Sequence, residues 1–414
     1  MDGDTRQVDV NFADAAKLGN ELLVRLDRIR ETDPIFWSDI NKCWVVTGHR
    51  EVVEGYRGDL PLSNVKLHHA FAAVPVEEQQ KRIPYLMESM PQWLIDMDPP
   101  DQPRLRRLMM KAFSRPVIEG MRPVAKQIIN ETLDAIAGKD EIEFVSAVAR
   151  QIPSRVILRL MGLSDELIGP MRRWADTINA TFGGLDRSVA LLERAEAVMH
   201  EMRGYFLPLI EERRRNPTDD FISALVTARD EGNKLSEEEL LGICYLTLLA
   251  GNDSTGGTII LSTVALAQHP EVCDYIRAHP DPASMMNVVM ELQRFVAMSM
   301  NQVRIVAQDF EWHGHPLKAG QFVFLFIAGA NRDPKVFAEP LKLDPTRPQD
   351  ANMTFAPGLH FCIGHLLAKM QLVEFFPELL RRYDVEVLDR HLDWHPSIAF
   401  RGLNSLHVRL HPRT

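Results

Sequence analysis

The sequence predicts a mainly α-helical protein with small β-sheets, and three observations support that prediction. From about residue 100 to 290, apolar residues recur at intervals of three and four, which is the spacing of amphipathic helices. From about residue 301 to 345, apolar and polar residues alternate and Gly-containing turns interrupt them, as in a series of short strands. A similar stretch, SLHVRLHP, lies near the C-terminus. Since no repeat or Gly/Ser-rich linker divides the chain, residues 1–414 are predicted to form a single domain.

Composition and charge exclude several classes of protein. The 414 residues include 47 Lys and Arg against 57 Asp and Glu, so the net charge is −10, and no long basic run favours nucleic-acid binding. The four cysteines form no CxxC pair, which disfavours a disulfide framework and a four-cysteine zinc site. The N-terminus lacks the features of a signal peptide. The most apolar stretch, Leu240–Gly251, is about a dozen residues, short of the ~20 that span a bilayer. We therefore expect a cytoplasmic protein without a membrane anchor.

One predicted helix is unusually long. Ser236 and Glu239 form a capping box, and the apolar pattern then continues to about Gln268, which gives ~32 residues and a length of ~48 Å. Its middle reads AGNDSTGG from Ala250, a cluster of poor helix formers. Two interpretations stay open: a helix–loop–helix with a break at this cluster, or a continuous helix in which the unfavourable residues mark a functional position.

Cys362 lies between Gly358 and Gly364, immediately before an apolar-periodic stretch that predicts a helix. A thiolate is stabilised at a helix N-terminus, where it can serve as a soft metal ligand. Two alternatives stay open at this point. A free cysteine can simply be buried as a small hydrophobe, and a zinc site could include His360 and His365, although the sequence offers no fourth ligand.

The five residues Phe355, Gly358, His360, Cys362 and Gly364 together resemble the cysteine-ligand loop of the cytochrome P-450 superfamily, the haem-thiolate monooxygenases. Three further stretches match in the same order: AGNDST from Ala250, ELQR from Glu291 to Arg294, and DPKVFAEPLKLDPTR ending at Arg347. The resemblance covers the chain from about residue 90 onward. It implies the cytochrome P-450 fold, with haem b between the long central helix and the cysteine loop. It also implies that Cys362 is the proximal iron ligand, whose thiolate favours O–O cleavage.

The resemblance assigns catalytic roles to an acid and an alcohol in the central helix. Asp253 and Ser254 are expected to deliver protons to the reacting oxygen. Here the chain departs from the family, which usually has Thr at the second position. Ser254 keeps the hydroxyl but lacks the methyl group that restricts the rotamers of Thr, so we expect oxygen use to be less tightly coupled to product.

The resemblance also implies the residues around the cofactor. A structural network behind the haem is expected from Glu291, Arg294 and Arg347. Many relatives carry His at the position of Gln102, which can donate a hydrogen bond but no charge. The residues expected to bind the haem are Arg106, Arg304, His360, Gln102, Phe355, Gly358, Gly364 and Ala250.

The expected substrate pocket is apolar. Its residues by resemblance are Leu246, Leu249, Met298, Ala399 and Phe400. Because no charged residue is placed over the haem, the sequence favours a neutral hydrophobic substrate of terpenoid, steroid or fatty/alkyl type.

Electrons are expected to come from another protein, because the sequence contains neither a GxGxxG after a strand nor a GxxxxGK[ST]. We expect a ferredoxin and a separate NAD(P)H-dependent ferredoxin reductase. The predicted docking patch is basic and consists of Arg104, Arg107, Lys111 and Lys369. The predicted function is O2-dependent hydroxylation; the alternatives are a peroxygenase that uses hydrogen peroxide and a non-catalytic haem-binding sensor or carrier.

Overall fold

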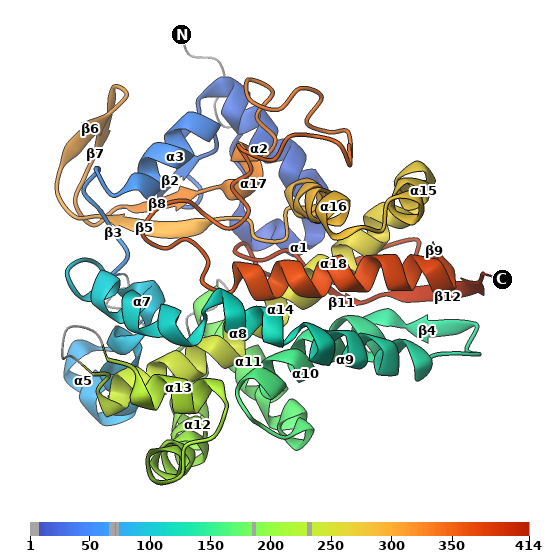
Figure 1. Ribbon diagram of the computed structural model, residues 1–414. Helices are drawn as coiled ribbons and strands as arrows, with labels where there is room; N and C mark the ends of the chain where they lie inside the picture. Colours follow the sequence, from blue (N-terminus) through green and yellow to red (C-terminus); the bar gives the residue numbers. More distant parts are fainter. Residues whose placement is uncertain (1–7, 66–70, 72–73, 184–187, 230–233, 414) are drawn as a thin grey trace. The chain divides into compact units, whose positions relative to one another are not determined.

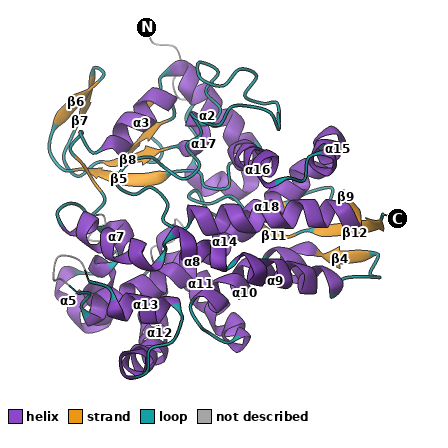
Figure 2. Ribbon diagram, in the orientation of Figure 1, coloured by secondary structure: helices purple, strands orange, loops and turns teal. Residues whose placement is uncertain are grey.

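Helices form most of the protein and the strands gather into small sheets (Figure 2), so the predicted fold class is confirmed. The computed structural model describes residues 8–65, 71, 74–183, 188–229 and 234–413. Contacts between residues divide the chain into two compact units, and the single domain stays a prediction. Unit 1 comprises residues 1–62, 125–152 and 254–414, and unit 2 comprises residues 63–124 and 153–253.

A five-stranded sheet in the order β1-β2-β8-β5-β3 includes the N-terminal strands (Figure 1). Its strands are β1 (Ile35–Ser38), β2 (Cys43–Val46), β3 (Leu62–Ser63), β5 (Gln302–Val306) and β8 (Phe322–Leu325). β2 and β8 run parallel, whereas β1 pairs antiparallel with β2, and β5 with β8. The alternating pattern after residue 301 thus predicted β5 and β8 correctly, but no pattern had singled out β1 and β2.

The two faces of this sheet bury separate hydrophobic clusters, because successive side chains of a strand point to opposite faces. Val45 packs in one cluster with Leu26 of helix α2 (Glu21–Thr32). Its neighbour Trp44 packs in the other cluster with Val52 of helix α3 (His49–Arg57). The sheet therefore fixes α3, whose end contacts the cysteine loop described below.

The rest of unit 1 consists of smaller sheets and helices. A three-stranded sheet has the order β4-β12-β9, and two hairpins pair β6 with β7 and β10 with β11. These strands are β4 (Glu141–Glu143), β6 (Phe310–Trp312), β7 (His315–Leu317), β9 (Tyr383–Val387), β10 (Asp393–Trp394), β11 (Leu403–Ser405) and β12 (His407–Pro412). The helices are α1 (Ala15–Leu18), α15 (Pro270–Ala278), α16 (Pro282–Val296), α17 (Ile327–Ala330) and α18 (His365–Arg382), together with α9 (Arg122–Asp134), whose first three residues belong to unit 2. The C-terminal strand prediction corresponds to β11 and β12.

Unit 2 is helical in its described part, as the three- and four-residue spacing predicts. Its helices are α5 (Val76–Arg82), α6 (Pro84–Ser89), α7 (Asp101–Ala112), α8 (Arg115–Gly120), α11 (Ile168–Gly183), α12 (Val189–Arg215) and α13 (Phe221–Thr227). Helix α10 (Gln151–Leu160) begins two residues before the boundary of this unit.

Helix α14 (Glu237–Gln268) is continuous over 32 residues, so the helix–loop–helix interpretation is wrong. The capping box forms as expected, with the Ser236 amide donating to Oε2 of Glu239 at 2.8 Å and the Glu239 amide donating to Oγ of Ser236 at 3.2 Å. In the cluster of poor helix formers at the middle of α14, Oδ1 of Asn252 accepts a hydrogen bond from Ser154 at 2.7 Å. A tertiary partner thus occupies a side chain that would otherwise compete with the helix backbone. Within the described residues, no helix is long and apolar enough to cross a membrane.

Candidate functional site

The cysteine loop leads into helix α18 and is held by backbone contacts. The amide of Cys362 donates to the carbonyl of Phe355 at 2.9 Å, which closes the loop on itself. The carbonyl of Cys362 accepts from Nδ1 of His365 at 2.8 Å. Gly358 has a φ of +82°, and a Cβ there would lie 2.3 Å from the carbonyl oxygen of Tyr56 in α3. A side chain at this position would therefore push the loop away from α3, which explains the glycine.

Cys362 differs from the other three cysteines in its exposure. Cys43, Cys244 and Cys273 are buried, whereas Cys362 is partly exposed. Burial raises the pKa of Cys43 to about 12 and that of Cys273 to about 11, and it also raises the pKa of Cys244. Because a metal ligand must be the thiolate, the three buried cysteines are unsuitable and Cys362 is the suitable one. The interpretation of Cys362 as a buried hydrophobe is wrong.

One face of α14 is accessible over two turns in a helix that is otherwise largely buried. Ala250 is exposed, and Leu246, Asp253 and Ser254 are partly exposed. These positions follow the spacing i, i+4, i+7 and i+8, so they share one face. Thr255, rotated away from this face, is only 4% exposed. The face thus presents apolar side chains first and an acid and an alcohol one turn later.

The Asp253 carboxylate is held by amide side chains that the sequence had not singled out. Nδ2 of Asn179 in α11 donates to Oδ2 of Asp253, and Nδ2 of Asn252 donates to Oδ1 at 3.1 Å. Asn252 is itself held by Ser154 of α10. All of these residues belong to unit 2. The local motif reveals Asp253, but its partner Asn179 is 74 positions away in sequence. Ser154, which holds Asn252, is 98 positions from that residue, so no spacing could indicate either contact.

The expected haem-binding cations differ in their surroundings. In unit 1, Arg304 is only 4% exposed and its guanidinium lies over the ring of Tyr56, 5.1 Å from the centroid. His360 is partly exposed in the cysteine loop. In unit 2, Gln102 and Arg106 both lie on α7, where Gln102 is fully buried and Arg106 is partly exposed.

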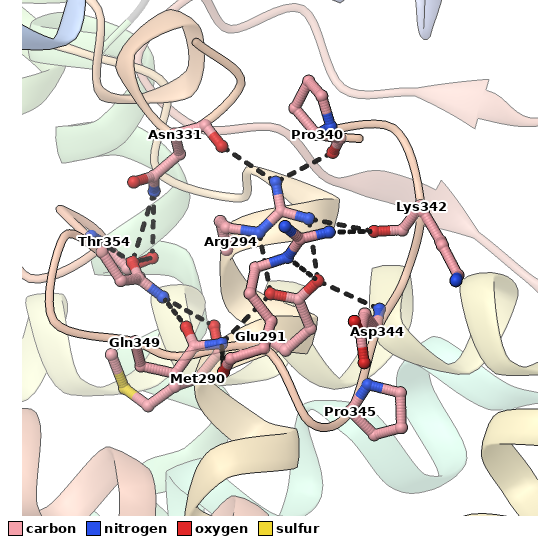
Figure 3. A network of polar contacts seen from close by, with 12 residues as sticks. Met290, Glu291, Arg294, Asn331, Pro340, Lys342, Asp344, Pro345, Gln349 and Thr354 are labelled. Atoms are coloured by element: carbon pink, nitrogen blue, oxygen red, sulfur yellow. Dashed lines mark hydrogen bonds and ion pairs between the residues drawn. The ribbon is translucent and has the colours of Figure 1, made fainter. Parts of the chain in front are cut away.

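Glu291, Arg294 and Arg347 are brought together in unit 1 by a buried network (Figure 3). Arg294 binds both carboxylate oxygens of Glu291 at 2.8 Å, and Nε of Arg347 donates to Oε1 of the same carboxylate at 3.1 Å. The two guanidinium groups also bind backbone carbonyls of residues 331–342. Removing the carboxylate would leave two buried cations without their counter-ion. The network therefore ties helix α16 to the segment of residues 331–347.

Comparison with known proteins identifies the family. The chain matches the family model described as Cytochrome P450 over residues 69–281 and 284–399. It is 30% identical over 395 residues to the polyketide biosynthesis cytochrome P450 PksS of Bacillus subtilis, covering 93% of this chain and 95% of that protein. The chain belongs to the cytochrome P450 family. It is also 32% identical over 317 residues to the 6-deoxyerythronolide B hydroxylase of Saccharopolyspora erythraea, covering 76% of each.

Solved P450 structures agree with this assignment. That of PksS from Bacillus subtilis has a TM-score of 0.84 at 28% identity, covering 95% of this chain and 98% of that one. That of CYP109E1 from Bacillus megaterium in complex with testosterone has a TM-score of 0.79 at 26% identity, covering 94% and 98%. The P450 fold, the monooxygenase class and the haem cofactor with its cysteine thiolate are therefore confirmed.

The residues of this P450 fit the family's cofactor. Haem iron needs a cysteine sulfur that it can reach, and the partly exposed Cys362 provides one. A bound haem and a substrate also need unpacked protein surface, which α14 provides around Ala250. For a zinc site, the described residues contain no group of three or more His, Cys, Asp or Glu side chains that could hold a metal ion.

The expected pocket residues of this P450 are not equally accessible. Phe400 is 39% exposed and Ala399 is partly exposed, and both precede β11. Met298 is 8% exposed and packs close to Gly257, where a Cβ would lie 3.0 Å from its Cγ. Leu249 is 5% exposed, in contrast to Leu246 one turn earlier.

The basic residues predicted for partner docking also differ. Arg104 forms an ion pair with Glu239 of α14, which holds the pKa of the guanidinium above its ordinary value. Arg107 and Lys111 are exposed on α7. In unit 1, Nζ of Lys369 lies over the ring of Phe355 at 4.9 Å; burial lowers its pKa and the Cys362 thiolate opposes that shift. The charge of Arg104 is thus largely neutralised by Glu239.

Proposed function

We propose that this P450 inserts one oxygen atom of O2 into a C–H bond of a neutral hydrophobic small molecule. The observation that carries the proposal is the accessible face of α14, which presents the apolar Leu246 and Ala250 next to Asp253 and Ser254. An apolar surface beside two proton-carrying groups suits a substrate without charge. One relative is named for polyketide biosynthesis, another is the 6-deoxyerythronolide B hydroxylase, and one solved relative contains testosterone. Terpenoid, steroid and fatty or alkyl compounds are the substrate classes to test.

We propose Cys362 as the ligand of the haem iron, with Arg106, Arg304, His360 and Gln102 at the haem propionates. When bound, a thiolate-ligated haem supplies the redox chemistry that activates O2. The protein's part is to keep Cys362 as a thiolate in a loop with a fixed backbone. Arginine suits propionates because its planar donors match a carboxylate.

Asp253 and Ser254 are proposed to carry the protons that the reaction consumes. A carboxylate can accept a hydrogen bond from water, and a hydroxyl can both donate and accept one, so the two groups together can relay protons through water. Asn179 and Asn252 each donate a hydrogen bond to the Asp253 carboxylate and so orient it. Apolar side chains around Ala250 exclude bulk water from the substrate side.

We propose a ferredoxin as electron donor, reduced by a separate NAD(P)H-dependent reductase. The exposed Arg107 and Lys111 on α7, and Lys369 after the cysteine loop, are the groups proposed to attract its acidic surface. Arg104 belongs to the same helix, but its pairing with Glu239 leaves it a smaller share of that attraction.

Two measurements test the proposal. The first is the absorption spectrum of the reduced protein with carbon monoxide, for the wild type and for Cys362→Ser. A strongly red-shifted Soret band that the variant lacks supports thiolate ligation by Cys362; a band that survives in the variant refutes it. The second compares product formation with NADH, surrogate ferredoxin and reductase against hydrogen peroxide alone. Faster turnover with peroxide would favour a peroxygenase, and no turnover under either condition would favour a sensor or carrier.

A further inference from the structure

Asn331 is a buried asparagine next to the network of Glu291 and Arg294. It follows helix α17 directly and is 1% exposed. Its backbone carbonyl accepts a hydrogen bond from Nη1 of Arg294 at 2.9 Å. The main chain of Asn331 is therefore tied to the same guanidinium group that binds Glu291 (Figure 3).

The side chain of Asn331 extends from this network to the segment before the cysteine loop. Its Oδ1 accepts from the amide of Met353 at 2.8 Å. Its Nδ2 donates to Oγ1 of Thr354 at 3.3 Å and lies 3.4 Å from Oδ1 of Asn352 (Figure 3). One amide group thus contacts three consecutive residues, as donor to two and as acceptor from one.

Two steps connect these residues to Cys362. The carbonyl of Met353 accepts from the amide of Ala356 at 2.8 Å, which shapes the turn that follows. Phe355, next to Thr354, offers its carbonyl to the amide of Cys362 at 2.9 Å. A shift of residues 353 and 354 would therefore move the acceptor that holds the Cys362 amide.

A second set of contacts ties the same segment to helix α16. Nδ2 of Asn352 donates to the carbonyl of Met290 and to Oε1 of Gln349, each at 2.8 Å, and Nε2 of Gln349 donates to Oε2 of Glu291 at 3.1 Å. Residues 352–354 are thus held by Asn331 on one side and by helix α16 and Gln349 on the other. Of these contacts, those of Asn331 lie nearest in sequence to the cysteine loop.

We propose that Asn331 is a positioning residue for Cys362: it transfers the fixed geometry of the Glu291 and Arg294 network to residues 353 and 354 and so sets the orientation of the thiolate. The proposal rests on the proposed role of Cys362 as iron ligand. Partners that orient a metal ligand change metal affinity by ~10- to 100-fold when they are removed. An amide offers a separate acceptor oxygen and donor nitrogen on one short side chain, whereas an ionised Asp keeps the acceptor alone and Leu keeps neither.

The test uses Asn331→Leu and the milder Asn331→Asp, purified with haem. The matched control is Asn301→Leu, because Asn301 is also 1% exposed and donates to a backbone carbonyl, that of Ile398 at 2.7 Å, but none of its contacts reaches residues 353–355. We measure the Soret band of the reduced carbon monoxide complex, the midpoint potential of the iron, and haem retention against an excess of apomyoglobin.

We expect Asn331→Leu to lose haem ~10-fold faster than the wild type and to convert part of the thiolate-type Soret band to the blue-shifted band of a neutral thiol ligand. Asn331→Asp should lie between the two, with a shifted potential. Asn301→Leu should lose stability but keep the wild-type band and potential. Equal bands and potentials in Asn331→Asp and the control would refute the positioning role, even if Asn331→Leu did not fold. A wild type without a thiolate-type band would instead refute the proposed function.

Discussion

Ala356 adopts a left-handed backbone conformation in the loop that leads to Cys362, with a φ of +54°. A Cβ in this region costs ~1–2 kcal/mol, and glycine avoids that cost. Ala356→Gly is expected to raise the free energy of unfolding by ~0.5–1 kcal/mol, after the larger entropy of glycine in the unfolded chain is taken into account. Urea denaturation of the haem-loaded protein measures the change.

Ala368→Gly is the control for this prediction. Ala368 lies in helix α18, where glycine is expected to lower the free energy of unfolding by ~1 kcal/mol. The two substitutions should therefore have opposite signs. If Ala356→Gly destabilises the protein as much as Ala368→Gly does, the left-handed backbone of Ala356 carries no strain that glycine relieves.

Asn179→Ala is expected to reduce coupling between NADH oxidation and product. The substitution removes the hydrogen bond from Nδ2 to Oδ2 of Asp253 and leaves the one from Asn252 to Oδ1, so the carboxylate should be less firmly oriented. Proton delivery slows, and more reducing equivalents leave as hydrogen peroxide. The product-to-NADH ratio should fall several-fold, about as far as in Asp253→Asn, while the carbon monoxide spectrum stays unchanged.

Thr177→Ala tests whether the effect is specific. Thr177 lies on the same helix, two residues away, and its hydroxyl bonds only to the carbonyl of Arg173 among the contacts described for it. Its removal should leave the product-to-NADH ratio unchanged. A similar fall in both variants would show that α11 as a whole, and not the Asn179 side chain, governs coupling.

Local motifs explain why some site residues could be predicted from the sequence and others could not. Cys362, Gly358 and the Glu291–Arg294 pair follow from fixed spacings of a few residues. Asn179 and Asn331 act through partners 74 and 22 positions away, so their roles depend on how the chain folds back. An asparagine has no distinctive spacing of its own, and only the folded contacts reveal its role.

The same limit applies to whole elements. The capping box and apolar pattern of α14 predicted its ends, but intrinsic propensity alone gave no decision between a break and a continuous helix at AGNDSTGG. Ser154 in a neighbouring helix binds the Asn252 side chain, and this tertiary contact favours the continuous helix over a break. Strand β4 lies inside a stretch with helical spacing; it is only three residues long and exists through its pairing with β12.

The Glu143 side chain of β4 is expected to stabilise this junction. Its carboxylate accepts from the amides of Val145, Ser146 and Leu406, at 3.0, 2.7 and 3.0 Å, and from the Ser146 hydroxyl. Burial alone would raise the pKa of Glu143, but these hydrogen bonds outweigh it and hold the pKa below its ordinary value of 4.5. Glu143→Gln should lower the free energy of unfolding at pH 7 by ~2 kcal/mol.

The pH dependence of this effect has a definite sign. Because the folded pKa is lower than the unfolded pKa, the carboxylate stabilises the fold above pH ~4.5, and this contribution is lost as the pH falls through the folded pKa. The difference between the wild type and Glu143→Gln should therefore narrow as urea denaturation is repeated from pH 7 toward pH ~4. Glu141→Gln is the control, because this exposed residue of the same strand pairs only with Arg409 among its described ion pairs and should cost under ~1 kcal/mol. A constant difference across this pH range would contradict the argument.

At the scale of the whole molecule, the net charge of −10 opposes the approach of an acidic protein. A ferredoxin donor would therefore need a local basic surface that outweighs the long-range repulsion. On α7, Arg107 and Lys111 are exposed at the surface, and Nζ of Lys111 donates to the carbonyl of Arg229. Arg104 forms an ion pair with Glu239. The net effect of Arg104 on the field outside the protein is small, because its ion pair has no net charge.

Arg107→Gln combined with Lys111→Gln is thus expected to raise the ferredoxin concentration for half-maximal turnover ~10-fold at low ionic strength. Above ~0.5 M salt the difference from the wild type should nearly vanish, since the Debye length falls to a few ångströms. Arg104→Gln combined with Glu239→Gln is the control: it removes the ion pair without changing the net charge and should have a smaller effect at low salt. Initial rates with saturating substrate and varied ferredoxin measure all three. An equal effect of the charge-neutral control, or a deficit in Arg107→Gln with Lys111→Gln that salt does not remove, would place ferredoxin docking elsewhere on the protein.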